Sequence, residues 1–170
     1  MKKTKILVIL LLMIFLQGCI KNGLTYTLNP GKDTIELNES WADQGITMKF
    51  NGITLEATVD MDALDNQTIG DYLIVYSASY NNVTYLAYRY VFVRDQTAPV
   101  ATLNPGVDTI RVGSSWVDAG VTASDNSGTI DIMVQGTVNT DVVGEYIISY
   151  IIMDASLNET IVTRIVSVIA

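Results

Sequence analysis

The side chains that most often carry enzymatic chemistry are scarce in this sequence. It contains no histidine and a single cysteine, Cys19. Without histidine the chain cannot form a Ser-His-Asp triad, and zinc sites in most cases need Cys or His ligands. Carboxylates are plentiful, but a glycosidase pair must stand roughly 5–10 Å apart across a cleft, and no pair is singled out here. The composition therefore predicts a protein that is not an enzyme, with no catalytic residue to nominate.

Oxygen-bearing side chains on expected loops make calcium the one metal worth considering. Calcium binds six to eight oxygens at about 2.3–2.6 Å. The candidate ligands are Asp125, Asn126, Asp131, Asp154 and Asn158. Their spacing is not that of an EF-hand, and Asx turns that bond their own backbone are the simpler interpretation. We therefore expect no cofactor and keep calcium as the alternative.

The N-terminus has the pattern of an export signal. Residues 1–5 are basic, and residues 6–16 form an uninterrupted apolar run. A helix needs about 20 apolar residues to span a bilayer, so this run is too short for a comfortable span. Its length and its basic flank are typical of a signal peptide. We expect residues 1–18 to be removed from the mature chain.

The tetrapeptide Leu16-Gln17-Gly18-Cys19 resembles the lipobox of bacterial lipoproteins. The resemblance implies that signal peptidase recognises Leu16 and Gly18 and cleaves before Cys19, whose thiol carries a diacylglyceryl group. Each buried acyl CH₂ contributes about 0.8 kcal/mol, so two chains anchor stably where one does not. The protein is then expected on the extracytoplasmic face of a membrane in the cell envelope. An ordinary secretory signal with an incidental cysteine is the alternative.

The rest of the chain contains one sequence unit twice. Residues 28–47 and 103–122 share LNPG, DTI and a Trp-x-Asp-x-Gly segment at an offset of 75 residues. A second match aligns Gly70 and Tyr72 with Gly144 and Tyr146. A period of this length is right for a small domain and too long for a solenoid repeat. We expect a lipidated tether at 19–24, one domain at 25–95 and another at 96–170.

Both units carry the signals of an all-β fold. Runs rich in β-branched and aromatic residues are expected as strands at 53–59, 72–79, 85–93, 130–138 and 160–168. Turn signals lie between such runs, at Asn29-Pro30-Gly31, Asn51-Gly52, Asn104-Pro105-Gly106 and 125–128. Short strands separated by tight turns indicate a sandwich or a barrel. No stretch after residue 18 has the period and caps of a helix.

The order of these motifs resembles the bacterial immunoglobulin-like (Ig-like) domains found in tandem in surface proteins and crystal-toxin tails, and also hyalin-type repeats. Asp95-Gln96-Thr97-Ala98-Pro99 is similar to the linker that opens such units. The resemblance implies two tandem Ig-like antiparallel β-sandwiches without a disulfide. The first copy departs from it, because 48–52 and 80–83 replace the acidic loops at 125–128 and 154–158.

Aromatic residues give two further expectations. Trp41 and Trp116 occupy equivalent positions, which favours packing of a loop over stacking on a sugar. Tyr72 and Tyr146 are expected to act as tyrosine corners, with each hydroxyl bonded to nearby backbone. Alternation also places Tyr88 and Tyr90 together on one face of their strand. If that face is the outer one, the two rings form a patch typical of interfaces.

The sequence thus predicts a non-catalytic, surface-displayed lipoprotein that acts as an adhesion or protein-interaction module. A structural spacer or accessory subunit of an envelope complex is one alternative, and a carbohydrate-binding module is another. The expected partners are the membrane, through the lipid, and a protein or glycan at the cell surface. Nucleic acid is not expected, because the formal net charge is −8 and a phosphate backbone requires Lys and Arg.

Overall fold

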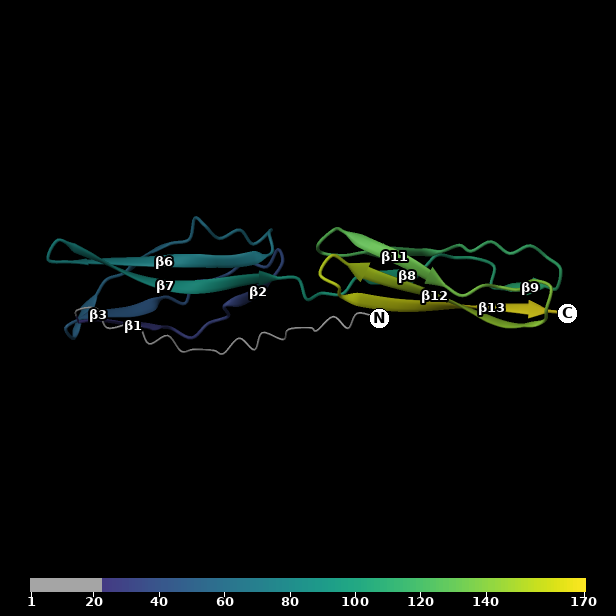
Figure 1. Cartoon of the computed structure of the whole chain (residues 1–170), viewed down its shortest axis with the longest axis horizontal. Coiled ribbons are helices and arrows are strands. Elements are labelled where there is room, and N and C mark those ends of the chain that lie inside the picture. The colour runs from purple at the N-terminus through teal and green to yellow at the C-terminus, as the bar shows by residue number, and fades with distance from the viewer. Residues whose placement is uncertain (1–22) are drawn as a thin grey trace, which may run out of the picture. The chain divides into compact units, whose positions relative to one another are not determined.

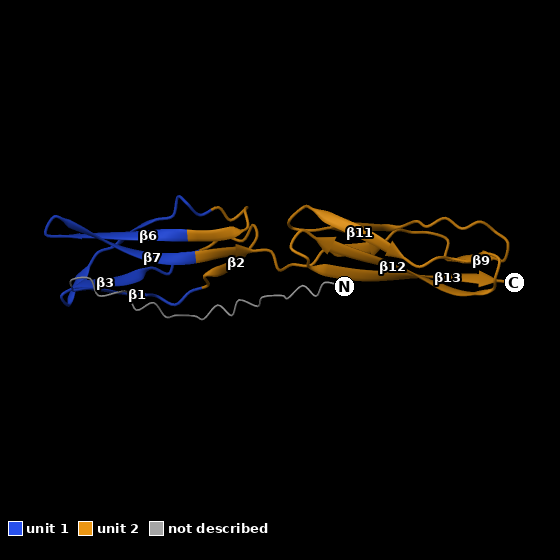
Figure 2. Ribbon diagram, viewed as in Figure 1, with its two compact units in different colours: residues 1–31, 42–64, 73–90 blue, residues 32–41, 65–72, 91–170 orange. Residues whose placement is uncertain are grey.

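The computed structural model describes residues 23–170, which form thirteen β-strands and no helix. No helix in this range is therefore long and apolar enough to cross a membrane. Two predictions fall outside the described residues. They are the signal peptide at residues 1–18, with its recognition residues Leu16 and Gly18, and the lipid attachment at Cys19. The chain divides into two compact units: residues up to 31, 42–64 and 73–90 form unit 1, and 32–41, 65–72 and 91–170 form unit 2 (Figure 2).

Seven strands precede residue 95 (Figure 1). They are β1 (Leu24–Leu28), β2 (Thr34–Glu36), β3 (Ile46–Phe50), β4 (Ile53–Leu55), β5 (Thr58–Asp60), β6 (Gly70–Tyr80) and β7 (Val83–Arg94). One sheet has the order β1-β3-β4 and the other β2-β7-β6-β5. The strand expected at 53–59 is interrupted, because β4 pairs with β3 in one sheet whereas β5 pairs with β6 in the other.

Six strands follow residue 95. They are β8 (Val100–Leu103), β9 (Thr109–Arg111), β10 (Val121–Ser124), β11 (Ile130–Gln135), β12 (Gly144–Asp154) and β13 (Glu159–Ile169). The order is β10-β8 in the small sheet and β11-β12-β13-β9 in the large one. The expected strand at 130–138 ends early, at Gln135. Gly136 follows at a φ of 102°, where a Cβ would lie 2.2 Å from the carbonyl oxygen of Ile147.

The two sheets of the second repeat enclose a common core. Ile148, Tyr150 and Ile152 of β12 are buried, and residues of β8 and β10 pack against them. This packing confirms the predicted all-β sandwich. The pairing is antiparallel except at one edge of each four-stranded sheet, where β9 runs parallel to β13 and β2 runs parallel to β7.

A buried arginine ties the loops of the second repeat together. Arg164 is 2% exposed, and its Nη1 lies 2.6 Å from Asp108 Oδ1. Its Nη2 donates to the carbonyls of Asn104 and Gly120, at 2.7 and 3.2 Å. Tyr150 donates its hydroxyl proton to Asp118, and Arg164 Nε donates to that hydroxyl oxygen at 3.3 Å. One guanidinium therefore holds the LNPG turn and the loop after Trp116 against β13.

The first repeat contains the same network. Arg89 is 1% exposed and donates to the carbonyls of Asn29 and Gly45, at 2.6 and 3.1 Å. Tyr76 donates to Asp43 at 2.5 Å. The residues repeated in the sequence are thus the residues of this network, which explains why LNPG and Trp-x-Asp-x-Gly recur.

The repeated aromatic residues have structural roles. The indole N–H groups of Trp41 and Trp116 donate to the carbonyls of Lys32 and Val107, at 2.8 and 2.9 Å. Trp116 also packs against the core of its sandwich, as the packing interpretation expects. The hydroxyls of Tyr72 and Tyr146 each donate to a carbonyl four residues earlier in the chain, at 2.6 and 2.9 Å. The tyrosine-corner prediction is confirmed in both copies.

We predict that Arg164→Met lowers the free energy of unfolding by about 3 kcal/mol, because it removes one partner of a buried ion pair and leaves two turn carbonyls without their donor. The matched control is Arg111→Met, since Arg111 is exposed and donates only to the carbonyl of Ala170. The control should change stability by no more than about 0.5 kcal/mol. Urea unfolding followed by Trp fluorescence measures both. Equal losses in the two variants would contradict the role of the network.

Candidate functional site

Three carboxylates of unit 2 converge where the chain enters the second repeat. Asp95 directly follows β7, Asp125 directly follows β10, and Asp154 ends β12. One oxygen from each of the three lies within 4.8 Å of the others. Asp95 and Asp154 are 7% and 4% exposed. We call these three residues the acidic cluster.

Loop backbone and hydroxyl groups hold most of the oxygens of the acidic cluster. Asp154 Oδ1 accepts the N–H groups of Ser156 and Asn158, both at 2.8 Å. Asp125 Oδ2 accepts the N–H and the hydroxyl of Ser127, at 2.7 and 2.5 Å. The Asx-type turns expected from the sequence are therefore present. They do not use Asp125 Oδ1, which is buried and accepts no hydrogen bond from residues 23–170.

Asp95 joins the cluster through its side chain and its backbone. Its Oδ1 accepts the N–H of Thr97 at 3.3 Å, and its Oδ2 accepts the hydroxyl of Ser156 at 3.2 Å. Burial raises the pKa of Asp95, and the nearby charges of Asp154 and Asp125 raise it further. Within residues 23–170, no Lys or Arg forms an ion pair with any carboxylate of the acidic cluster. The cluster thus concentrates negative charge that the described protein does not neutralise.

The structure brings only some of the sequence-derived calcium candidates together. Asp125 and Asp154 meet, and Asn158 is beside them, donating its side-chain N–H to Asp154 Oδ2 at 2.7 Å and to the carbonyl of Asp95 at 3.2 Å. Asn126 is exposed and donates to Glu36 Oε1 at 3.1 Å instead. Asp131 is exposed on β11, opposite Met153. Asp95 is not among the calcium ligands that the sequence predicts, although it begins the linker motif Asp95-Gln96-Thr97-Ala98-Pro99.

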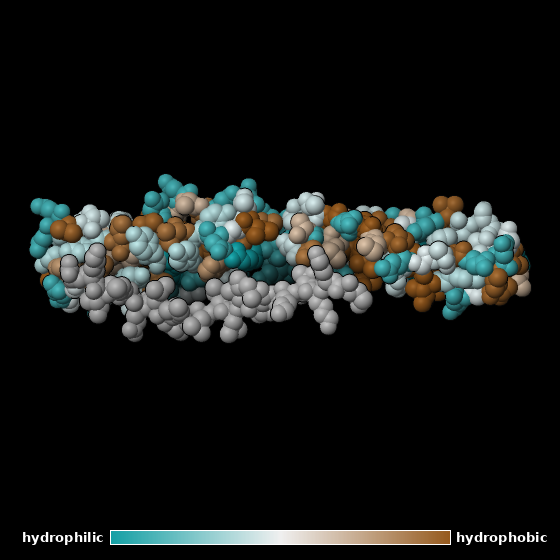
Figure 3. Space-filling model, viewed as in Figure 1, coloured by the Kyte–Doolittle hydropathy of each residue, from teal (hydrophilic) through white to brown (hydrophobic). Residues whose placement is uncertain are grey.

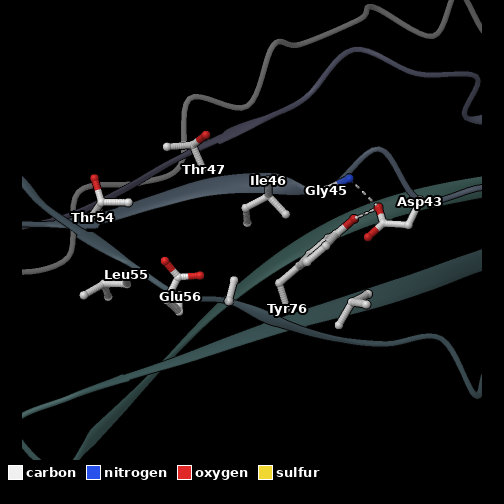
Figure 4. A pocket seen from close by; sticks show the side chains of 10 residues that line it. Asp43, Gly45, Ile46, Thr47, Thr54, Leu55, Glu56 and Tyr76 are labelled. Atoms are coloured by element: carbon white, nitrogen blue, oxygen red, sulfur yellow. Dashed lines mark hydrogen bonds between the residues drawn. The ribbon is translucent and has the colours of Figure 1, made fainter.

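The described residues of unit 1 contain a pocket of about 250 Å³. Figure 4 shows the hydroxyl of Tyr76 directed at Asp43, whose Oδ1 also accepts the N–H of Gly45 at 2.9 Å. Burial raises the pKa of Tyr76, and the hydrogen bond to Asp43 adds to the increase. The Oδ1 of Asp43 is therefore already hydrogen-bonded to Tyr76 and Gly45. The rest of the pocket is lined by Thr and aliphatic side chains around Glu56.

The outer face of the large sheet in unit 2 carries exposed apolar residues on both sides of a polar row formed by Gln135, Ser149 and Thr163. Ile147 lies opposite Ile165, and Ile151 lies opposite both Ile161 and Met133. Ile147, Ile161, Ile165 and Met133 are 54–59% exposed. We call these five residues the isoleucine face. In Figure 3, hydrophobic surface drawn in brown gathers over the region that β11 and β12 occupy in Figure 1.

Exposed aromatic residues lie on β7 in unit 1. Tyr88 and Tyr90 are 41% and 53% exposed, whereas Ala87, Arg89 and Val91 between and beside them are buried. The alternation expected from the sequence therefore holds, and the two tyrosines point to the solvent side of the sheet.

Comparison with known proteins gives a family match over the second repeat. Residues 106–168 match the family model described as bacterial surface protein, Ig-like domain. The second repeat is thus similar to the Ig-like domains of bacterial surface proteins, as its motifs predicted. Among curated proteins, none matches the chain. Among solved structures, the crystal structure of human protocadherin-24 EC1-2 (form II) matches with a TM-score of 0.37 and 16% identity, covering 88% of this chain and 83% of that one.

We predict that Asp95→Asn raises the stability of the protein at pH 7 in the presence of EDTA. The substitution removes a buried charge that faces two other carboxylates, while the amide keeps an oxygen for the N–H of Thr97. The control is Asp131→Asn, which removes an exposed charge outside the acidic cluster. Urea unfolding should give a higher midpoint for Asp95→Asn alone. A lower midpoint would show that the described residues already stabilise the Asp95 carboxylate.

Proposed function

We propose that the protein is a non-catalytic lipoprotein displayed at the bacterial surface, where its Ig-like sandwiches act as an adhesion or protein-interaction module. The observation that carries the proposal is the isoleucine face. A sandwich of this kind buries its core between the sheets, so the outer face needs no large apolar residues for that core. Exposed apolar patches on soluble domains mark interaction sites.

The composition of the isoleucine face favours a protein partner. Two aliphatic cross-strand pairs, Ile147–Ile165 and Ile151–Ile161, lie on either side of the polar Ser149–Thr163 pair. Asp131, Glu145 and Glu159 lie on the same face of the sheet as an acidic rim. An apolar centre with a polar rim is the usual anatomy of a protein interface. The acidic rim favours a partner with basic residues around an apolar patch and disfavours an anionic lipid surface.

Two other functions remain alternatives. A structural spacer would need no apolar face, so the exposed isoleucines favour binding over spacing. A carbohydrate-binding module would stack sugars on aromatic rings, and Tyr88 and Tyr90 provide exposed rings for this. The two binding modes use different strands and can be separated by mutation.

We predict that the double variant Ile147→Ser, Ile165→Ser loses adhesion. Truncating central interface residues costs about 1–2 kcal/mol each, so the pair should weaken binding roughly 30-fold or more. Beads coated with the protein are mixed with intact cells of the producing bacterium, and the bound fraction is counted by flow cytometry. The variant Val117→Ser is the control, because Val117 is 82% exposed on the loop between β9 and β10 and belongs to no strand of this face.

Adhesion of the wild type and of the control, with loss in the double variant, supports the proposal. Wild-type beads that bind no better than uncoated beads would instead favour the spacer. Loss of binding in a Tyr88→Ser, Tyr90→Ser variant, with full binding by the isoleucine variant, would favour the glycan-binding alternative.

We predict that Cys19→Ser prevents lipid attachment. The wild-type protein should partition into the membrane fraction and carry the mass of a diacylglyceryl group at the N-terminus of its mature chain, because two acyl chains anchor stably. The variant offers no thiol to the lipid and should keep its leader or be released. Fractionation with intact-mass spectrometry distinguishes these states. A variant that stays membrane-bound without its leader would contradict lipid anchoring through Cys19.

A further inference from the structure

The acidic cluster presents a set of oxygens that protein groups alone leave incomplete. Asp125 Oδ1 is buried, carries the charge of its carboxylate and has no donor within the described structure. Burying a charged oxygen without a partner is costly, and native proteins seldom leave one unsatisfied. Two further carboxylates, each more than nine-tenths buried, converge on the same point. The chemistry of these three carboxylates therefore suits a positively charged ligand.

The first repeat shows that uncharged residues can occupy the positions equivalent to two members of the acidic cluster. Asp125 and Asp154 correspond in the repeat to Phe50 and Tyr80. These two rings pack with centroids 5.5 Å apart, and Phe50 also packs against Tyr85 at 4.7 Å. The fold therefore accepts an aromatic cluster at this position, and the carboxylates of the second repeat are not required by the sandwich itself.

The geometry of the acidic cluster suits one particular class of cation. All candidate ligand atoms are oxygens, which excludes the nitrogen and sulfur sets that zinc favours. Two oxygens on opposite sides of a calcium ion stand about 4.6–5.2 Å apart, against about 4.2 Å for magnesium. The oxygens of the acidic cluster lie within 4.8 Å of one another, which is close enough for a single calcium ion to bridge them.

We infer that Asp95, Asp125 and Asp154 together bind one calcium ion, with Asp125 Oδ1 as a ligand and water completing the coordination. The ion neutralises charge that no Lys or Arg of the described residues pairs with. It also joins three chain segments of unit 2: the segment after β7, the turn between β10 and β11, and the loop between β12 and β13. Calcium binding thereby adds a second tie, beside the hydrogen bonds from Ser156 and Asn158, between Asp95 and the loop that follows β12.

The test uses the detergent-solubilised full chain, first treated with EDTA and then dialysed. Addition of about 5 mM CaCl₂ should raise the melting temperature by at least about 4 °C, since extracellular calcium modules bind at 0.1–1 mM and a ligand of the native state stabilises it. Isothermal titration should give one calcium per chain, and about 5 mM MgCl₂ should give less than half of the shift.

The decisive variant is Asp125→Asn, which keeps an oxygen for the Ser127 bonds but removes the ligand charge. It should melt at or above the wild-type temperature in EDTA and bind calcium at least about tenfold more weakly. Asp95→Asn tests the same site from another segment and should also lose the calcium response. Asp131→Asn, outside the cluster, should keep the full response.

The inference is overturned if calcium leaves the wild-type melting temperature unchanged, if magnesium gives an equal shift, or if Asp131→Asn loses the response as completely as Asp125→Asn. A destabilised Asp125→Asn protein would not obscure the result, because the Asp95→Asn variant is expected to be more stable than the wild type in EDTA. These outcomes are independent of the adhesion experiments, since none of the substitutions lies among the residues of the isoleucine face.

Discussion

The buried guanidinium of Arg164 is the constraint on which the second sandwich depends. An arginine inside a β-sandwich is costly to desolvate, and a single carboxylate seldom offsets that cost. Here the same group also serves two turn carbonyls, so turns that could not form a regular ladder still have their backbone acceptors satisfied. Asp108 and Asp118 supply the counter-charge from two different loops. The loops are therefore ordered by one buried cation, and the strands they connect are held in register as a result.

The parts of the structure that could be predicted from sequence are those that local patterns determine, whereas contacts such as those of Arg164 could not be predicted. Long strands such as Thr160–Val168 alternate clearly, and Asn51-Gly52 adopts the positive φ values that a tight hairpin requires. The tyrosine corners could also be predicted, because they depend on contacts four residues apart. The break between Leu55 and Thr58 could not, since Glu56 and Ala57 carry no turn signal and only the choice of sheet interrupts the strand. The role of Arg164 depends on loops 44 and 60 residues away, which no local pattern reveals.

The candidate site could be predicted only in part, because the sequence gives residue types and local patterns but not the contacts between distant segments. Asp125 and Asp154 lie in polar loops, so their residue types alone made them candidates. Asp131 has the same type but sits on a strand, where the pleat turns it to the outer face, opposite Met153. In the sequence, Asp95 belongs to a linker motif. Only the tertiary structure shows that it is 7% exposed and faces the loops after β10 and β12. Residue type identified the chemistry, whereas the topology decided which carboxylates meet.

The repeat also separates structural residues from functional ones within a single chain. The arginine, the tyrosine and the aspartate of the loop network occur in both copies, because each sandwich must order the same turns. The acidic cluster differs between copies, because Phe50 and Tyr80 stand where Asp125 and Asp154 do. The outer face is apolar in both copies: Leu73, Leu86 and Tyr90 are 37–53% exposed and correspond in the repeat to Ile147, Ile161 and Ile165. Both copies fold, so the carboxylates are not a condition of the sandwich. Three converging carboxylates with an unsatisfied oxygen lower stability unless a cation joins them, and exposed isoleucines lower solubility unless a partner covers them. The acidic cluster costs the isolated domain stability, and its sister domain does without it, so it is best explained by what the second domain binds.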